Sequence, residues 1–333
     1  MRTRAPPRKI AFMRILVTGG TGFVGSHAAA ALVRAGHDVR LLVRDPRRIA
    51  PALAPHGIHG VEHRIGDVLD ERAVANAMNG ADAVLHAAAV YSVRRWHAGR
   101  IRRTNVRAAE IVLGQGVRAG LDPVVHVSSY SAGLPSPRST LVPGDPLSTA
   151  RWPYVHSKAE SERVARRHQD AGAPVVVVSP GMVWGPYDPH RGESTLLARD
   201  IVRRRLPFRP AGGVPLVDVR DLAEAIAAVF EPGRGARSYL LGGRHVALDD
   251  LVAGLGAAAV RPAPRWLHPA LGTVMEAFRI TLQDPRTDDT LAERELGFAP
   301  RPTQDTLDDT VRWMAGVGLV RPHVAGQREP SPI

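Results

Sequence analysis

A tyrosine and a lysine four residues apart form the pair with the clearest chemistry in this sequence, in the segment Tyr154-Val-His-Ser-Lys158. Positions i and i+4 share one face of a helix, so the phenol and the ammonium would point into the same space. A nearby cation lowers the pKa of a tyrosine from about 10 toward neutral pH, and such a tyrosine serves as a general acid or base. Only Lys9 and Lys158 are lysines, so chance rarely produces this spacing. The pair is predicted to be catalytic, the alternative being an ordinary surface pair.

Ser128 and Ser129 stand at the end of a predicted strand at 124–128. Open α/β sheets bind their ligands at the carboxyl ends of the strands. A hydroxyl at this edge would orient a carbonyl group beside Tyr154. Because two serines after a strand are usually just a turn, this prediction depends on the tyrosine.

Residues 14–25, RILVTGGTGFVG, predict a turn that binds a dinucleotide. The apolar run 15–17 is typical of a buried parallel strand, and an Ala-rich helix is predicted at 26–35. Between them Gly19, Gly22 and Gly25 allow unusual backbone angles, close approach of a pyrophosphate and tight packing of helix on strand. The helix N-terminus then offers free N–H groups to the phosphates. A tight turn that binds nothing is the alternative.

The end of the second strand, at 39–43, bears on the choice of cofactor. Asp45 lies 20 residues after Gly25, the spacing of an acid that bonds the ribose 2′-hydroxyl of NAD. However, Arg44 directly follows Val43, and a guanidinium binds a 2′-phosphate bidentately. We therefore predict a preference for NADP(H), with NAD(H) as the alternative if Arg44 is merely a solvated strand end.

Strand and helix signals alternate through the first half, which predicts βαβ units and a parallel sheet. The fold class is α/β, a Rossmann-type doubly wound parallel sheet with a smaller C-terminal substrate-binding lobe. The predicted strands of the sheet are at 15–17, 39–43, 61–65, 83–89, 124–128 and 174–179, and the helix of Tyr154 is at about 154–170.

The second half is predicted to return to the sheet and then to build the lobe. A returning strand is expected at 214–219, a helix at 221–230 and a late strand at 238–241. Further helices are expected at about 193–204, 248–258, 265–281 and 305–315. The predicted organisation is a flexible extension at 1–12, a NAD(P)-binding domain at 13–180 with a return segment at 214–242, a lobe at 181–213 and 243–320, and a flexible tail at 321–333. Translation from Met1 or from Met13 is left open.

The composition narrows the class of protein. The formal charge is +12, from 44 basic and 32 acidic residues, but the arginines are scattered and no groove-reading motif accompanies them, so we expect no nucleic acid partner. No apolar run approaches the roughly 20 residues that span a bilayer, and the N-terminus lacks the apolar region of a secretory signal. A cytoplasmic protein is expected. There is no cysteine and no metal-ligand pattern, and His86 and His126 are predicted to be satisfied core residues.

Together these motifs resemble the extended short-chain dehydrogenase/reductase superfamily, in its NAD(P)-dependent epimerase/dehydratase group. The resemblance covers about 13–315. Within the group, VRLLVRDP at 39–46 looks most like dihydroflavonol 4-reductase-like proteins, whose arginine there holds the NADP 2′-phosphate. The other matching motifs are TGGTGFVG at 18–25, GDV at 66–68, HAAA at 86–89, TNV at 104–106, VSS at 127–129, YVHSK at 154–158, SPGMVWGP at 179–186, VDVRDLAEA at 217–225 and ELGFAP at 295–300.

The resemblance implies roles for particular residues. Ser129, Tyr154 and Lys158 would be the catalytic set, and Tyr154 and Lys158 would also touch the cofactor. Substrate would contact Ser129, Tyr91, Tyr130, Met182 and Trp184. The remaining cofactor contacts would be Gly19, Thr21, Gly22, Phe23, Val24 and Gly25 around the pyrophosphate, Arg44 at the 2′-phosphate, Asp67 and Val68 at the adenine, Ala87, Ala88 and Ala89 along the ribose, and Pro180 and Val183 beside the nicotinamide.

The predicted activity is NADP(H)-dependent reduction of a carbonyl, or oxidation of an alcohol, on a small molecule. One alternative is a nucleotide-sugar epimerase or dehydratase that keeps its cofactor tightly bound. A non-catalytic NADP-binding regulator is a further alternative. A homodimer is common among such relatives. Because the segment between Asp82 and Glu110 has no acid, an anionic substrate is one hypothesis and a solvated helix face the other; its arginines are Arg94, Arg95, Arg100, Arg102, Arg103 and Arg107.

Overall fold

The computed structural model describes residues 12–90, 98–256, 260–268 and 276–322. In these ranges, parallel strands form a seven-stranded central sheet of order β10-β7-β5-β4-β1-β2-β3. The order reverses between β1 and β4, and such a switch point opens a crevice at the carboxyl ends of the strands. The predicted Rossmann-type sheet is confirmed. Its strands are β1 (Arg14–Thr18), β2 (Asp38–Val43), β3 (Glu62–Ile65), β4 (Ala83–His86), β5 (Val124–Val127), β7 (Val175–Pro180) and β10 (Arg237–Leu241).

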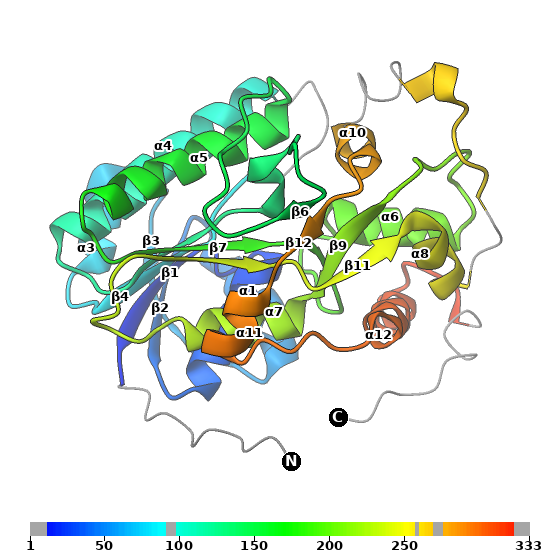
Figure 1. Ribbon diagram of the computed structural model, residues 1–333. Helices are drawn as coiled ribbons and strands as arrows, with labels where there is room; N and C mark the ends of the chain where they lie inside the picture. Colours follow the sequence, from blue (N-terminus) through cyan, green and yellow to red (C-terminus); the bar gives the residue numbers. More distant parts are fainter. Residues whose placement is uncertain (1–11, 91–97, 257–259, 269–275, 323–333) are drawn as a thin grey trace, which may run out of the picture.

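Helices cover both faces of this sheet (Figure 1). One face carries α1 (Phe23–Arg34), α7 (Val219–Ala228) and α11 (Thr290–Leu296), with the short α2 (Ile49–Leu53) beside β2. The other carries α3 (Glu71–Met78), α4 (Ala98–Arg118) and α5 (Pro153–Asp170). Successive strand residues alternate between the two cores, so Val17 packs under α1 whereas Leu16 faces α3 and α4. This alternation explains why the inner strands β4, β5 and β7 are buried at almost every position.

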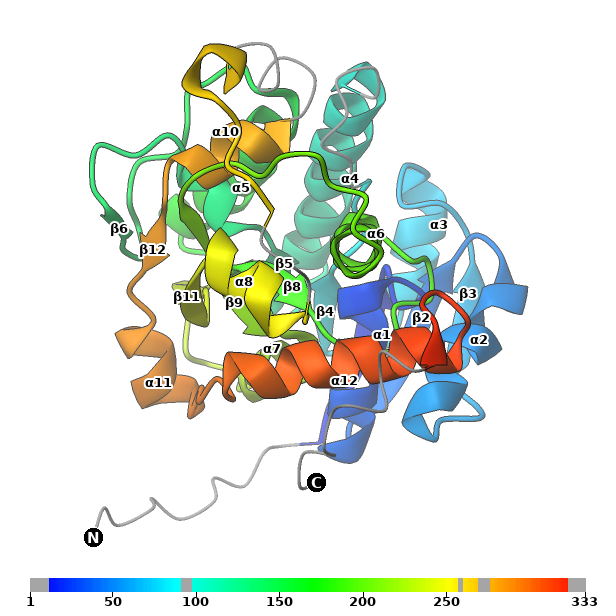
Figure 2. The same ribbon diagram turned by 90° about the vertical axis from the view of Figure 1, so that its right-hand side faces the viewer.

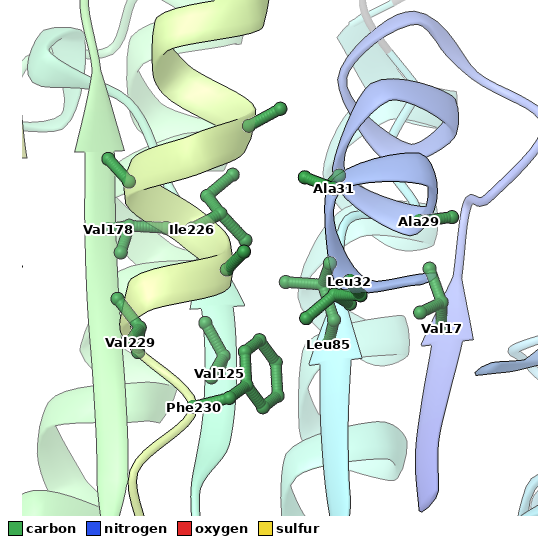
Figure 3. Packing of buried hydrophobic residues seen from close by; sticks show 14 of the residues in the cluster. Val17, Ala29, Ala31, Leu32, Leu85, Val125, Val178, Ile226, Val229 and Phe230 are labelled. Carbon is green, nitrogen blue, oxygen red and sulfur yellow. The ribbon is translucent and has the colours of Figure 1, made fainter. Parts of the chain in front are cut away.

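The core under α1 and α7 is tightly filled (Figure 3). Phe230 follows α7, extends toward Val125 of β5, and is 1% exposed. Replacing Phe230 with Ala is expected to lower the free energy of unfolding by about 3–5 kcal/mol, because the cavity cannot fully collapse.

Denaturant unfolding of Phe230→Ala checks this expectation. Phe12→Ala is the matched control, because Phe12 is 74% exposed and should change the stability by under about 0.5 kcal/mol. Equal losses in the two variants would contradict the packing described.

A second sheet lies beside the carboxyl ends of the first, where the chain leaves the main sheet at Gly181. It has the order β11-β9-β8 among the described residues. Its strands are β8 (Met182–Trp184), β9 (Gly213–Asp218) and β11 (Arg244–Ala247). Helices α6 (Glu193–Val202), α8 (Leu248–Gly254) and α12 (Thr303–Gly316) pack on it with a separate core, and α12 crosses the outside of this lobe (Figure 2).

The expected returning strand at 214–219 is β9, and the expectation that it joins the main sheet is wrong. It pairs with β8 and β11, and β10 is the strand that extends the main sheet beside β7. Every residue of β9 is buried, so its apolar pattern fits either sheet equally well. Strand β4 likewise ends at His86, and residues 87–89 leave the sheet.

A third, two-stranded sheet joins the lobe to the main domain. It pairs β6 (Thr140–Leu141) with β12 (Arg286–Thr287), just after α10 (Glu276–Leu282). Of the helix expected at 265–281, the structure describes a 3-10 turn at Arg265–Leu267 and α10, while residues 269–275 lie outside the described ranges. So do most of both predicted terminal extensions, 1–11 and 323–333. No described helix is long and apolar enough to cross a membrane.

Candidate active site

The predicted tyrosine lies at a cluster of hydroxyl groups at the end of β5. Tyr154 is in the first turn of α5, and its hydroxyl forms hydrogen bonds with Ser129 and Ser131. The Oγ atoms of the two serines are 2.9 Å apart, and the N–H of Ser131 donates to Ser129 Oγ. The sequence analysis missed Ser131. Its only signal was the Ser-x-Ser spacing, which is typical of a side-chain-capped turn.

Burial, rather than the lysine, controls the ionisation of this tyrosine. Tyr154 is 9% exposed, and burial raises its pKa to about 12, although the hydrogen bonds with both serines lower it. The carboxylates of Glu276 and Glu193 raise it further. The prediction of a lowered pKa is wrong here, because burial outweighs the interactions that lower it. Tyr154 is therefore protonated at neutral pH.

Lys158 lies one turn after Tyr154 and is buried. Its Nζ donates to the carbonyl oxygens of Val127 and Ser128, at 3.5 and 3.4 Å. Burial lowers the pKa of Lys158 to about 8, and the negative charge of Glu162 opposes that shift. The ammonium thus remains at the end of β5, close to both predicted catalytic partners.

Glu162 is a buried carboxylate on the same helix that the sequence analysis did not select. It accepts a hydrogen bond from Ser128 Oγ at 2.5 Å and pairs with Arg166 at 2.6 Å. Ser128 therefore faces away from the tyrosine, and Ser129 is the serine that meets it. The i+4 spacing of Lys158, Glu162 and Arg166 was the available signal.

Asn105 links the loop after β4 to α5. Its side chain pairs with both backbone groups of Val90, at 2.7 and 3.0 Å, and donates to Ser157 Oγ at 3.0 Å. The TNV motif contained this asparagine, but sequence reasoning gave it no role. The amide is needed here because only a side chain with both a donor and an acceptor satisfies this pattern.

The glycine turn forms a cradle of backbone at the start of α1. The N–H of Gly22 donates to the carbonyl oxygen of Gly19 at 2.8 Å. Gly19 has φ +77°, and a Cβ there would lie 2.6 Å from the backbone nitrogen of Ala88. The first turn of α1 has neither a side-chain cap nor an acidic residue. Free N–H groups, no negative charge and no room for side chains fit the pyrophosphate of a dinucleotide. The turn thus brings Gly19 close to Ala87 and Ala88.

A substitution at Gly25 is the most direct test of this backbone cradle. A Cβ at Gly25 would lie 2.1 Å from the carbonyl oxygen of Gly19, so α1 would have to move away from the turn. Gly25→Ala is expected to weaken NADPH binding at least about tenfold, or 1.4 kcal/mol, in a fluorescence titration.

Gly316→Ala is the matched control, because a Cβ at this helical position meets no atom within 4 Å. It should leave the affinity unchanged. Unaltered NADPH affinity in a folded Gly25→Ala protein would contradict the assignment of the cradle.

At the end of β2 the two candidate cofactor-binding groups differ. The side chain of Arg44 is 72% exposed, and its nearest carboxylate oxygen, on Asp67, is 3.9 Å away. Asp45 instead caps a short 3-10 helix, where it accepts hydrogen bonds from the backbone and the side chain of Arg47. Arg47 holds the pKa of Asp45 below its usual value. Arg44 is therefore available to a ligand, whereas Asp45 is already engaged.

The remaining predicted contacts differ in burial. Thr21 in the glycine turn and Val68 after β3 are partly buried, as are Met182 and Val183 on β8, whereas Ala89 after β4 is exposed and Pro180 ends β7. Tyr130 is buried against Tyr154. Tyr91 lies outside the described residues.

The prediction that Trp184 contacts substrate is corrected by its burial. Trp184 is 1% exposed and packs in the core of the lobe against Leu216 and Ala198. An apolar residue after a strand signals burial as readily as binding, so the sequence could not separate the two.

The two buried histidines differ. His86 bonds Thr18 Oγ1 through Nδ1 at 2.8 Å, as expected of a satisfied core residue. His126 stacks on His86, but neither of its ring nitrogens has a hydrogen-bond partner among the described residues, so that expectation is wrong for His126. Burial lowers the pKa of both, and both rings are neutral.

The arginine-rich segment is described only in part. Arg94 and Arg95 lie outside the described residues, and the side chains of 100–103 are not described. Arg107 forms surface ion pairs with Glu71 and Glu110, at 2.6 and 3.1 Å. This arginine therefore has local partners and lies on a solvated helix face.

Comparisons with known proteins agree with this geometry. The family model for the NAD dependent epimerase/dehydratase family matches residues 15–242. A Synechocystis sp. protein provisionally named a dihydroflavonol 4-reductase is 27% identical, over 92% of this chain and 95% of its own. The 4-hydroxy-2-methyl-3-oxo-4-farnesyl-3,4-dihydroquinoline-1-oxide ketoreductase of Stigmatella aurantiaca is 29% identical, over 94% and 100%. The crystal structure of dTDP-glucose 4,6-dehydratase from Streptomyces venezuelae, with NAD bound, matches with a TM-score of 0.74 and 28% identity, over 93% and 99%.

Proposed function

This chain belongs to the NAD dependent epimerase/dehydratase family, and we propose that it is an NADP(H)-dependent reductase of a small carbonyl compound. The observation that carries the proposal is the buried, protonated Tyr154, whose hydroxyl meets Ser129 and Ser131 at the end of β5. A protonated tyrosine is the acid that carbonyl reduction requires. The relatives named a dihydroflavonol 4-reductase and a ketoreductase support the same reaction class.

Each residue of the candidate site has a separate role in the proposed carbonyl reduction. A bound nicotinamide cofactor would supply the hydride. Tyr154 donates its proton to the carbonyl oxygen, which Ser129 orients, and the hydrogen bond of Ser131 stabilises the tyrosinate left behind, while Lys158 would hold the ribose of the cofactor. Ser131 bonds both Ser129 and Tyr154, so it fixes the direction of the hydroxyl groups. Fixed donors at the developing oxygen charge favour the transition state over the bound carbonyl.

Tyr154→Phe tests the proton transfer. Turnover of NADPH with a panel of ketones and aldehydes is expected to fall about 10²–10⁴-fold, because the acid is lost while the ring is kept. NADPH affinity should stay within about twofold. Tyr239→Phe is the matched control, because its hydroxyl bonds Glu295 at 2.8 Å and not the serine cluster.

Equal turnover by wild type and Tyr154→Phe would contradict the role of the tyrosine. A wild-type protein that binds NADPH but reduces no carbonyl would instead favour a non-catalytic NADP-binding regulator.

The preference for NADPH rests on Arg44. Among the described residues, its exposed guanidinium has the Asp67 carboxylate as its one ion-pair partner, at 3.9 Å, and the second strand ends in Val43, which is not an acid. Arg47 engages Asp45, so that carboxylate would contribute little repulsion toward a 2′-phosphate. These features favour a phosphorylated ribose over a free 2′-hydroxyl.

Arg44→Ala is expected to weaken NADPH binding about tenfold or more and to leave NADH binding within about twofold, because only NADPH carries the 2′-phosphate. Binding titrations of both nucleotides measure the difference. Arg47→Ala, which removes a neighbouring arginine already paired with Asp45, serves as the control and should discriminate less. An equal loss for NADPH and NADH would overturn the assignment.

A second candidate is a nucleotide-sugar dehydratase or epimerase, favoured by the match to dTDP-glucose 4,6-dehydratase. In such an enzyme the tyrosine would first remove a proton and later return it, and the cofactor would end each cycle unchanged. It predicts a cofactor that co-purifies with the protein and is not consumed. A reductase would instead exchange its nucleotide freely and oxidise one NADPH for each carbonyl reduced. Measuring nucleotide release and consumption therefore distinguishes the two candidates.

A further inference from the structure

Helix α5, which carries Tyr154 and Lys158, begins without a cap of its own. Its N-cap residue is Trp152, which makes no side-chain hydrogen bond to the helix, and its first turn contains no acidic residue. The first N–H groups of a helix have no partner within it, and burying them unpaired is costly. Pro153 removes one such donor, which leaves the N–H groups of Tyr154 and Val155 to be satisfied.

Glu276, more than a hundred residues later in the chain, supplies both partners. Its Oε2 accepts from the N–H of Tyr154, and its Oε1 accepts from the N–H of Val155, each at 2.8 Å. The side chain is buried, and burial raises the pKa of the Glu276 carboxyl while the two N–H donors and Arg279 lower it. A carboxylate at a helix N-terminus is favoured by both hydrogen bonding and the helix dipole.

The helix that carries Glu276 is docked at this end of α5 (Figures 1 and 2). Ile280 of α10 packs in one apolar cluster with Tyr130 and Tyr154. The guanidinium of Arg279 lies 5.8 Å from the ring centroid of Trp152. Directly after α10, β12 pairs with β6 of the main domain. The lobe therefore contacts the catalytic helix at its first turn.

The residue whose amide is capped is also the residue whose hydroxyl meets the serines. A shift of the first turn would therefore move the Tyr154 hydroxyl away from Ser129 and Ser131, whereas Lys158 lies one turn further along. We propose that Glu276 is a positioning residue for the catalytic tyrosine and that it couples docking of the lobe to the alignment of Tyr154. This inference rests on the reductase function proposed above and deepens it.

The experiment compares Glu276→Gln, which keeps the length and one acceptor oxygen, with Glu276→Ala, which keeps neither. Hydrogen–deuterium exchange in the peptide covering 152–158 is expected to be at least tenfold faster at the first turn in Glu276→Ala and intermediate in Glu276→Gln. Carbonyl reduction is expected to fall at least tenfold in kcat, with NADPH affinity within threefold. Arg279→Ala, on the same helix, is the control for loosened docking and should change each quantity less than threefold.

A double-mutant cycle separates positioning from general destabilisation. If Glu276 acts through the tyrosine, Tyr154→Phe costs much less kcat in the Glu276→Ala background than in the wild type. Additive losses would overturn the positioning role, and protected amides in Glu276→Ala would overturn the cap itself. A wild-type protein that reduces no carbonyl would count against the reductase proposal, while amide exchange would still decide whether Glu276 caps α5.

Discussion

The interaction on which the site depends is the hydrogen bonding of a buried tyrosine hydroxyl to two serines at the end of a strand. Tyr154 lies in a mostly apolar cluster with Tyr130, Leu240 and Ile280, so burial disfavours its ionised form. Ser129 and Ser131 come from the turn after β5, whereas the tyrosine comes from α5. This hydrogen bonding therefore requires that α5 keep a fixed position relative to the central sheet.

Several buried polar contacts hold α5 in this position. Asn105 and Ser157 tie it to the loop after β4, and Glu162 ties it to Ser128. Glu276 closes its first turn from the lobe. Each of these groups is buried and has its partners, so each specifies one arrangement of the helix; a shift would leave charges or amides unpaired. The lobe thus contacts the helix of Tyr154 at its first turn.

The fold was largely predictable because its signals are local. The glycine turn after 15–17 and the strand–helix alternation specify the central sheet, and the Y-x-x-x-K spacing placed Tyr154 and Lys158 on one helix. Ser129 followed from its place at a strand end. These features depend on neighbours within about five residues, which a single sequence displays.

The rest depends on contacts between distant residues. The sequence of β9 does not indicate which sheet the strand joins, because all of its residues are buried and would suit either sheet. Glu276 has no recognisable spacing to Tyr154, with which it pairs across 122 positions. The pKa of Tyr154 was predicted in the wrong direction because proximity to Lys158 is visible in the sequence, whereas burial is not. Trp184 was misplaced for the same reason.

The most direct measurement is a cofactor titration of the purified wild-type protein with NADPH and NADH, after any nucleotide that co-purifies has been released and identified. A reductase whose cofactor exchanges freely and whose Arg44 binds the 2′-phosphate should bind NADPH at least about tenfold more tightly than NADH. This ratio corresponds to a difference of about 1.4 kcal/mol in binding free energy. Tightly retained NAD, with no preference for the phosphorylated nucleotide, would contradict the reductase and point to the nucleotide-sugar enzymes instead.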